Sequence, residues 1–289
     1  MTGRADRGWR AAVLGSPIGH SLSPALHRAA YAELGLDWTY EAYDVDATGL
    51  PGFLGGLDDR WVGLSLTMPL KAAVLVHLDS STAVVEAAGG ANTVLLREGR
   101  RAGDNTDVPG MVAALAAHGV TDVSEAAVLG GGATARSAVV ALGSVTRRVV
   151  VYVRDPRRTP GLEVAAERSG VDLAVRAWDR ATDGLSAALV VATTPSGATD
   201  HLTAGLPGRP GALFDVLYDP WPTPIAAGWA ARGGQVIGGL ELLVHQAVLQ
   251  VLLMTGATVA AERLVVPMRV AGETALRTRP PSTAGRPTG

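Results

Sequence analysis

A glycine-rich stretch in the middle of the chain constrains the fold more than any other feature of the sequence. Residues 126–136 read AAVLGGGATAR, which is a short apolar run typical of a buried strand, three glycines and a segment that favours helix. A second apolar run, RRVVVYVRD at 147–155, follows that helical segment. Strand, glycine loop, helix and strand in this order predict a βαβ unit, and therefore a parallel α/β sheet.

The glycine loop fits the pattern G-x-G-x-x-A, which is typical of dinucleotide binding when it joins a strand to a helix. The first glycine allows a tight turn, the second admits a pyrophosphate, and the small third residue lets helix and strand pack closely. The helix N-terminus supplies N–H groups to the phosphates. The alternative is a glycine-rich turn that binds nothing. The candidate cofactor residues of the loop are Gly130, Gly131, Gly132, Ala133, Thr134 and Ala135.

The residues that follow the second strand bear on which dinucleotide is bound. The sequence RDPRR brings Arg154, Arg157 and Arg158 together, and guanidinium groups bind a 2′-phosphate in bidentate fashion. Asp155 in the same turn would repel a phosphate. We expect NADP as the cofactor, with NAD and a solvated basic turn as the alternatives.

Length and composition narrow the class of protein. The 289 residues suggest about two domains, and a net charge of −2 without a dense basic stretch argues against a nucleic-acid partner. The chain has no cysteine, which excludes disulfides and thiolate metal sites and fits a cytoplasmic location. We expect no membrane segment, because polar residues interrupt the apolar region 238–260. The histidines lack metal-ligand spacing, so we expect no metal.

One lysine stands out in this arginine-rich chain. Arginine accounts for 24 of the 25 basic residues, and Lys71, in the stretch SLTMPLKAAV, is the exception. Because lysine can release its proton in a protein and arginine cannot, Lys71 is a candidate for proton transfer. Asp107, in GDNTDVPG, is its candidate partner. The alternative is that Asp107 only caps a helix that Pro109 opens.

Five further polar residues are candidates for substrate binding. Ser21 and Ser23 precede a helical segment, where hydroxyl and N–H groups suit a carboxylate, although Ser23 could simply be the N-cap. Asn92 lies in a glycine-rich turn, where asparagine is common for conformational reasons. Gln246 lies in an apolar helix, either as a ligand or on an exposed face. Tyr218 is either a core residue or a donor to a carboxylate.

Together these segments resemble the shikimate dehydrogenase family. The resemblance covers residues 13–275 and rests on the motifs GSPIGHSLSPALH, SLTMPLK, GANT, DNTD, GGGATAR, RDPRR, DVLYDPWPTP and GLELLVHQA, in the order and spacing of the family. It implies NADP-dependent, reversible reduction of 3-dehydroshikimate to shikimate, a step of aromatic amino acid biosynthesis.

The resemblance also implies roles for individual residues. Lys71 and Asp107 become the catalytic pair. The implied substrate contacts are Ser21, Ser23, Ser65, Thr67, Asn92, Tyr218 and Gln246, with Ser65 standing where the family usually has asparagine. Beyond the glycine loop, the implied cofactor contacts are Arg136, Arg154, Arg158, Thr193 and Gly239.

The family fold consists of two α/β domains with the active site in the cleft between them. It implies an N-terminal parallel α/β substrate domain, 1–107, completed by C-terminal helices in 239–277. A Rossmann-like NADP-binding domain would span 108–238. The segment 278–289 is rich in proline and glycine, so we expect it to be disordered. We expect a monomer or a homodimer.

Three other functions stay open at this point. A quinate or aminoshikimate dehydrogenase of the same family, which could use NAD, would share nearly every motif. A folate dehydrogenase would share the two-domain plan, but the HSLSP segment argues against it. A non-catalytic dinucleotide-binding regulatory protein is disfavoured by the presence of Lys71, Asp107 and Gln246.

Overall fold

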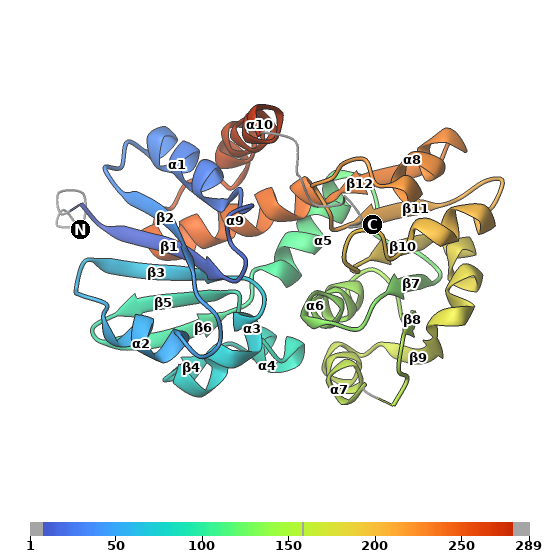
Figure 1. Cartoon of the computed structure of the whole chain (residues 1–289), viewed down its shortest axis with the longest axis horizontal. Coiled ribbons are helices and arrows are strands. Elements are labelled where there is room, and N and C mark those ends of the chain that lie inside the picture. The colour runs from blue at the N-terminus through green and yellow to red at the C-terminus, as the bar shows by residue number, and fades with distance from the viewer. Residues whose placement is uncertain (1–7, 158, 280–289) are drawn as a thin grey trace, which may run out of the picture.

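The chain forms two α/β lobes that lie side by side, each built on a six-stranded sheet (Figure 1). The structure is a computed structural model that describes residues 8–157 and 159–279. The first lobe contains the N-terminal strands, and the second contains the glycine loop. This arrangement confirms the expected two-domain α/β fold.

The sheet of the N-terminal lobe is mixed. Its strand order is β2-β1-β3-β5-β6-β4, and β5 runs antiparallel to both β3 and β6, where the sequence predicted a parallel sheet. The two-residue turn Glu98–Gly99, in which both residues have positive φ, accounts for the β5–β6 pairing, because such a tight hairpin joins antiparallel strands. The strands are β1 (Arg10–Gly15), β2 (Thr39–Asp44), β3 (Trp61–Leu66), β4 (Ser80–Ser81), β5 (Thr93–Arg97) and β6 (Arg100–Asp104).

Helices from both ends of the sequence cover this sheet. The C-terminal helices pack with the first helix on one face, around a core that includes Tyr31, Tyr40, Val248 and Leu264 (Figure 1). The helices of this lobe are α1 (Ser23–Leu34), α2 (Leu50–Gly55), α3 (Leu70–Ala73), α4 (Ala83–Ala88), α9 (Gly239–Thr255) and α10 (Glu262–Thr278), with a 3-10 turn at Val74–His77.

All strands of the second sheet run parallel, in the order β12-β11-β10-β7-β8-β9. Numbered from β7, this is the 3-2-1-4-5-6 order of the Rossmann fold, in which ligands bind at the carboxyl ends of the central strands. The strands are β7 (Ala126–Leu129), β8 (Arg148–Val153), β9 (Asp172–Ala177), β10 (Leu189–Ala192), β11 (Ala212–Asp215) and β12 (Gln235–Gly238). The helices are α6 (Ala133–Leu142), α7 (Pro160–Ser169) and α8 (Pro224–Ala231), with 3-10 segments at Trp178–Ser186 and Asp200–Gly205.

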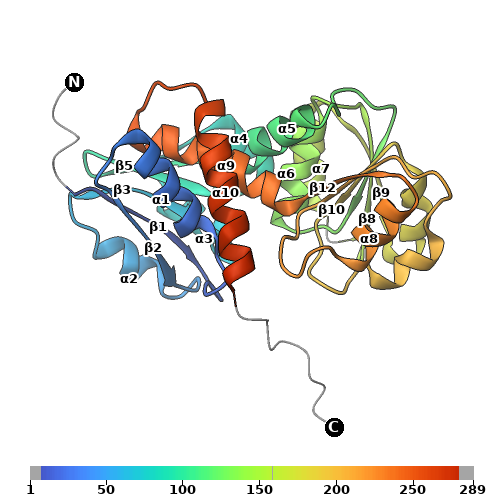
Figure 2. The same ribbon diagram turned by 90° about the horizontal axis from the view of Figure 1, so that it is seen from above.

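The chain crosses between the lobes through two helices that pack on each other. These are α5 (Asp107–Ala117) and α9, which lie centrally in Figure 2. Gly110 allows the close approach, since a Cβ there would lie 2.8 Å from the backbone nitrogen of Gln246. The crossing helices start at 107 and 239, next to the expected domain boundaries.

The C-terminal end of the described chain is held in place. Thr278 is the last residue of α10, and the guanidinium of Arg279 donates to Asp219 at 2.7 Å and to the carbonyl of His20 at 2.6 Å. These two residues therefore do not belong to the disordered tail expected at 278–289, and residues 280–289 of that expectation lie outside the described residues. Within the described ranges, none of the helices has both the length and the apolar character needed to cross a membrane.

Candidate active site

Two connected cavities lie between the lobes. The smaller has a volume of about 260 Å³, and its wall is rich in polar side chains from β3, α1, α5 and α9. The larger, of about 720 Å³, is lined by the glycine loop of the second lobe. Both cavities share Thr67, Lys71 and Thr134. A small molecule in the first cavity and an elongated one in the second would therefore meet beside Lys71.

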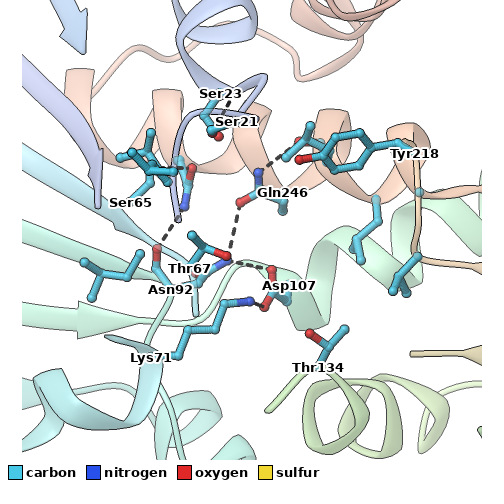
Figure 3. A pocket seen from close by; sticks show the side chains of 18 of the residues that line it. Ser21, Ser23, Ser65, Thr67, Lys71, Asn92, Asp107, Thr134, Tyr218 and Gln246 are labelled. Atoms are coloured by element: carbon cyan, nitrogen blue, oxygen red, sulfur yellow. Dashed lines mark hydrogen bonds and ion pairs between the residues drawn. The ribbon is translucent and has the colours of Figure 1, made fainter. Parts of the chain in front are cut away.

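Lys71 and Asp107, the catalytic pair proposed from the sequence, are in direct contact. The Nζ of Lys71, on the short helix after β3, donates to Oδ2 of Asp107 at 2.5 Å (Figure 3). Both side chains are largely buried, with exposed fractions of 15% and 8%. Asp107 is the first residue of α5, and Thr106 occupies the N-cap position. The Asp107 carboxylate therefore serves the lysine rather than the end of its helix.

Asn92 holds the other carboxylate oxygen of Asp107. Its Nδ2 donates to Oδ1 of Asp107 at 2.8 Å and to Oγ1 of Thr106 at 3.0 Å, while its Oδ1 accepts from the backbone N–H of Thr106 at 2.8 Å. Asn92 is 2% exposed. Its role in the turn is therefore more than conformational, because it fixes the orientation of the carboxylate.

Gln246 joins the same network from helix α9. Its Oε1 lies 3.3 Å from both Nδ2 of Asn92 and Oγ1 of Thr106, and its Nε2 donates to the carbonyl of Leu243 at 3.0 Å. The side chain is buried and lines the smaller cavity (Figure 3). An exposed helix face, one of the two alternatives from the sequence, is therefore wrong.

Ser21, Ser23 and Tyr218 line another part of the smaller cavity (Figure 3). Ser23 is the first residue of α1 rather than its N-cap, which is Leu22, so the predicted capping position was one residue late. The Oγ of Ser21 accepts from the backbone N–H of Ser23 at 3.3 Å. Burial raises the pKa of Tyr218, so its phenol stays protonated and can donate to an anion. These hydroxyls together suit a carboxylate.

Ser65 lines the smaller cavity, and its hydroxyl group takes part in a buried hydrogen-bond network. Its Oγ accepts from the hydroxyl of Tyr40 at 2.6 Å and donates to Oε1 of Gln250 at 2.8 Å. The Nε2 of Gln250 in turn donates to Oγ1 of Thr93 at 2.9 Å and to the carbonyl of Asn92 at 3.1 Å. With its one proton used, Ser65 can only accept a hydrogen bond from a ligand.

Gln250 was missed in the sequence, although it lines the smaller cavity. The available signal was its spacing, because a glutamine four residues after Gln246 lies on the same face of a helix. His27 completes this network, with Nε2 3.3 Å from Oε1 of Gln250 and its ring stacked on Tyr40 at a centroid distance of 3.8 Å. Full burial lowers the pKa of His27 to about 3, so the ring is neutral.

The glycine loop has the shape that a dinucleotide requires. Gly130 has a φ of +113°, and a Cβ there would lie 2.7 Å from Oγ1 of Thr193. A Cβ on Gly131 would meet Val153 at 2.7 Å, whereas the space beside Gly132 is open. Gly132 therefore leaves room for a pyrophosphate at the start of α6, as the pattern predicts.

The other predicted cofactor residues divide into two groups. Thr193 and the exposed Arg154 line the larger cavity, and Arg158 lies outside the described residues. Gly239 lines the smaller cavity instead, because helix α9 begins there. The larger cavity also includes residues that the sequence did not suggest, namely Met68, Pro69, Ala72, Trp178, Thr194, Pro195 and Ala198.

Two residues of the loop motif turn away from the larger cavity. Ala135 is fully buried in the core of the second lobe, which agrees with the packing role of a small residue at that position. Arg136 points to the N-terminal lobe, where its Nε donates to the carbonyl of Ala88 at 2.9 Å. The sequence predicted that Arg136 contacts the cofactor, whereas its guanidinium donates to backbone carbonyl groups of the N-terminal lobe.

Comparison with known proteins agrees with this geometry. Residues 13–94 match the family model for the shikimate dehydrogenase substrate binding domain. The chain is similar to the shikimate dehydrogenase (NADP(+)) of Thermus thermophilus, with 39% identity over 251 residues that cover 86% of this chain and 92% of the relative.

Solved structures extend the similarity to both lobes. The shikimate dehydrogenase of Mycobacterium tuberculosis superposes with a TM-score of 0.83 at 38% identity, covering 91% of this chain and 99% of that one. The Thermus thermophilus enzyme in complex with NADP(H) and shikimate gives a TM-score of 0.77 at 35% identity, with 91% and 99% of the two chains covered. By sequence and by structure, this chain belongs to the shikimate dehydrogenase family.

Proposed function

We propose that this protein is an NADP-dependent shikimate dehydrogenase that reversibly reduces 3-dehydroshikimate to shikimate. The observation that carries the proposal is the Lys71–Asp107 pair at the junction of the two cavities. The relatives named as NADP(+)-dependent shikimate dehydrogenases, and the related enzyme solved with NADP(H) and shikimate, support it. As a biosynthetic enzyme that uses NADPH, it would act in the cytoplasm.

The smaller cavity provides for each part of the proposed substrate. Ser21, Ser23 and Tyr218 offer hydroxyl groups to the ring carboxylate. Gln246 offers an amide to the ring hydroxyls, and Asn92 lines the same part of the cavity beside Asp107. Because these polar side chains are held by the protein before substrate arrives, little reorganisation is needed when the ring binds.

The Lys71–Asp107 pair serves the oxygen that changes between carbonyl and hydroxyl. NADPH, when bound along the glycine loop, supplies the hydride that adds to the carbonyl carbon. The ammonium of Lys71 stabilises the negative charge that develops on the oxygen, and the pair delivers the proton that completes the hydroxyl. In the oxidative direction the same pair removes that proton.

The residues of the larger cavity fit a dinucleotide phosphate. The N–H groups at the start of α6, beside the open space at Gly132, would bind the pyrophosphate. Arg154, at the tip of β8, would bind the 2′-phosphate that distinguishes NADP from NAD.

A substrate-by-cofactor assay tests the proposal. Initial rates are measured with shikimate, quinate and aminoshikimate, each with NADP and with NAD. We expect the highest kcat/KM for shikimate with NADP. Preference for quinate or aminoshikimate, or for NAD, would assign one of the sister activities. NADP binding without turnover on any of these substrates would indicate a regulatory dinucleotide-binding protein.

A further inference from the structure

Arg136 connects the two lobes beside the active site. It lies on α6, two residues after Thr134, which lines both cavities. Its guanidinium reaches the end of α4, where Nε donates to the carbonyl of Ala88 at 2.9 Å and one terminal nitrogen donates to the carbonyl of Gly89 at 3.4 Å. Figure 1 shows α4 of the N-terminal lobe facing α6 across the boundary.

The local structure of α4 presents these carbonyls to the arginine. Gly89 ends the helix with a φ of +62°, a conformation that glycine adopts without strain. A Cβ on Gly89 would lie 3.6 Å from Nε of Arg136, so the guanidinium packs directly on this turn. Burial lowers the pKa of Arg136, and the two carbonyl oxygens accept from two of its three guanidinium nitrogens.

A second link joins the same two parts of the molecule. The Nδ2 of Asn105 donates to the carbonyl of Gly90 at 2.8 Å and to Oγ of Ser137 at 3.3 Å. Ser137 follows Arg136 on α6, and both Asn105 and Ser137 are 1% exposed. Two consecutive residues of α6 are therefore connected to the segment 88–90, one directly and one through Asn105.

The backbone of the proposed catalytic pair is bonded to Ala91, which follows this segment, and to Asn105. The N–H of Ala91 donates to the carbonyl of Lys71 at 2.8 Å, and a Cβ on Gly90 would lie 3.2 Å from the same oxygen. On the other side, Oδ1 of Asn105 accepts from the backbone N–H of Asp107 at 3.1 Å. The backbone of Asp107 is thus one hydrogen bond away from Asn105, which α6 contacts, and the backbone of Lys71 is bonded to Ala91, the residue that directly follows the segment 88–90.

Resting on the function proposed above, we propose that Arg136 is a positioning residue that fixes the Lys71–Asp107 pair relative to helix α6. The helix starts at the glycine loop, so it sets where the dinucleotide lies, while the segment 88–91 sets where the lysine lies. Hydride transfer requires the dinucleotide and the lysine to be correctly placed at the same time, and a misplacement of about 1 Å can lower the rate about 10²-fold. Arg136 acts through these contacts and not by binding the cofactor.

The experiment compares Arg136→Met with Arg168→Met. Arg168 is a matched control because it also joins the second lobe to α4, through an ion pair with Glu86 at 3.4 Å. Unlike Arg136, it forms this contact at the surface, because the side chains of Arg168 and Glu86 are both more than half exposed. The full-length variants are assayed for kcat, for KM and for the primary isotope effect with NADPH deuterated at the transferred position. NADP affinity is measured separately by titration of the protein fluorescence.

We expect Arg136→Met to lower kcat by about 10- to 100-fold, with a larger isotope effect and a Kd for NADP within twofold of the parent protein. Arg136→Lys should recover part of kcat, because an ammonium can donate to the same carbonyls. Arg168→Met should leave all of these quantities unchanged. Unchanged kcat in Arg136→Met, or an equal loss in Arg168→Met, would overturn the proposal.

A weaker NADP complex with normal kcat would also overturn it, because that result would make Arg136 a cofactor ligand. Circular dichroism checks that each variant is folded. If Arg136→Met does not fold, Ser137→Ala removes the second link with a minimal change of volume and should still raise the isotope effect. Failure of the proposed function is recognised separately, since the parent protein would then not turn over shikimate with NADP.

Discussion

The Nζ of Lys71 and Oδ2 of Asp107 lie 2.5 Å apart, although the two residues are 36 positions apart in the sequence and belong to different helices. Asn92 holds the other oxygen of the carboxylate at 2.8 Å. The ammonium therefore has a fixed direction toward the space shared by the two cavities. Catalysis should depend on both members of the pair.

We expect Lys71→Ala to lower kcat by about 10²–10⁴-fold, the usual contribution of proton transfer, while the fold is retained. Lys71→Arg should also lose most of the activity, because arginine keeps the charge but cannot release a proton. Steady-state kinetics with circular dichroism as the control measure both. A Lys71→Arg variant with near-normal kcat would show that charge alone is sufficient.

Two glycines of the same loop should respond differently to alanine. Gly130→Ala places a side chain at a φ of +113° and 2.7 Å from Oγ1 of Thr193, so we expect about 1–3 kcal/mol loss of unfolding free energy. Gly132→Ala finds open space and an ordinary φ of −81°, so stability should be unchanged. Its methyl group would occupy the space for the pyrophosphate, and the Kd for NADP should rise about tenfold.

Urea unfolding and NADP titration of both variants check this prediction. If Gly132→Ala binds NADP as tightly as the parent protein, the pyrophosphate does not approach the backbone there. If Gly130→Ala is fully stable, the turn does not depend on glycine.

Ser65 should matter more for stability than for substrate affinity. Ser65→Ala leaves the buried Tyr40 hydroxyl without the Ser65 acceptor and removes the shorter of two contacts to Oε1 of Gln250, which we expect to cost about 1–3 kcal/mol of unfolding free energy. The KM for shikimate should change less than twofold, since the Ser65 proton is already used. Ser144→Ala, at an exposed serine that donates to the carbonyl of Ala141, is the control and should change stability by less than about 0.5 kcal/mol.

Unfolding free energy and KM are measured on the same preparations. A large increase in KM with unchanged stability would show that Ser65 donates to the substrate after all.

His27 should make the protein less stable as the pH falls. Its pKa is about 3 in the folded protein and about 6.5 when unfolded, because burial disfavours the charged ring. Between these values the unfolded chain binds the extra proton, so unfolding free energy falls with decreasing pH by up to about 1.4 kcal/mol per unit. His27→Gln should therefore show a shallower decrease of stability between pH 6.5 and 4.

Chemical denaturation at several pH values measures this slope. His245, whose pKa burial also lowers, contributes with the same sign in both proteins, so the difference between the two slopes isolates His27. Parallel slopes would mean that His27 is not buried as a neutral ring.

Local patterns were sufficient to predict the elements that hold the site. The apolar strand, the three glycines and the helix that follows form the loop of the second lobe as expected, with Gly130 in the conformation that the motif needs. The same patterns placed Lys71 after a strand and Gln246 on an apolar helix. They could not distinguish a capping role from a catalytic role for Asp107, because an aspartate at the start of a helix is compatible with both.

The hydrogen-bond partners of polar side chains could not be predicted from the sequence. Ser65 was expected to contact substrate, and its proton goes to Gln250, which is 185 residues away. Arg136 was expected at the cofactor, and its guanidinium crosses to α4. The sheet of the N-terminal lobe was expected to be parallel, and β5 runs antiparallel to both of its neighbours.

The two-lobe α/β plan, the dinucleotide loop motif and the residue types of the proposed catalytic pair could be predicted from the sequence, because these depend on periodicity, glycine positions and residue type over short distances. The free hydroxyl groups, the arginine that lines the larger cavity and the contacts that join the two lobes became known only from the folded chain. Those outcomes depend on the packing of α5, α6 and α9, which brings residues far apart in the chain within hydrogen-bond distance.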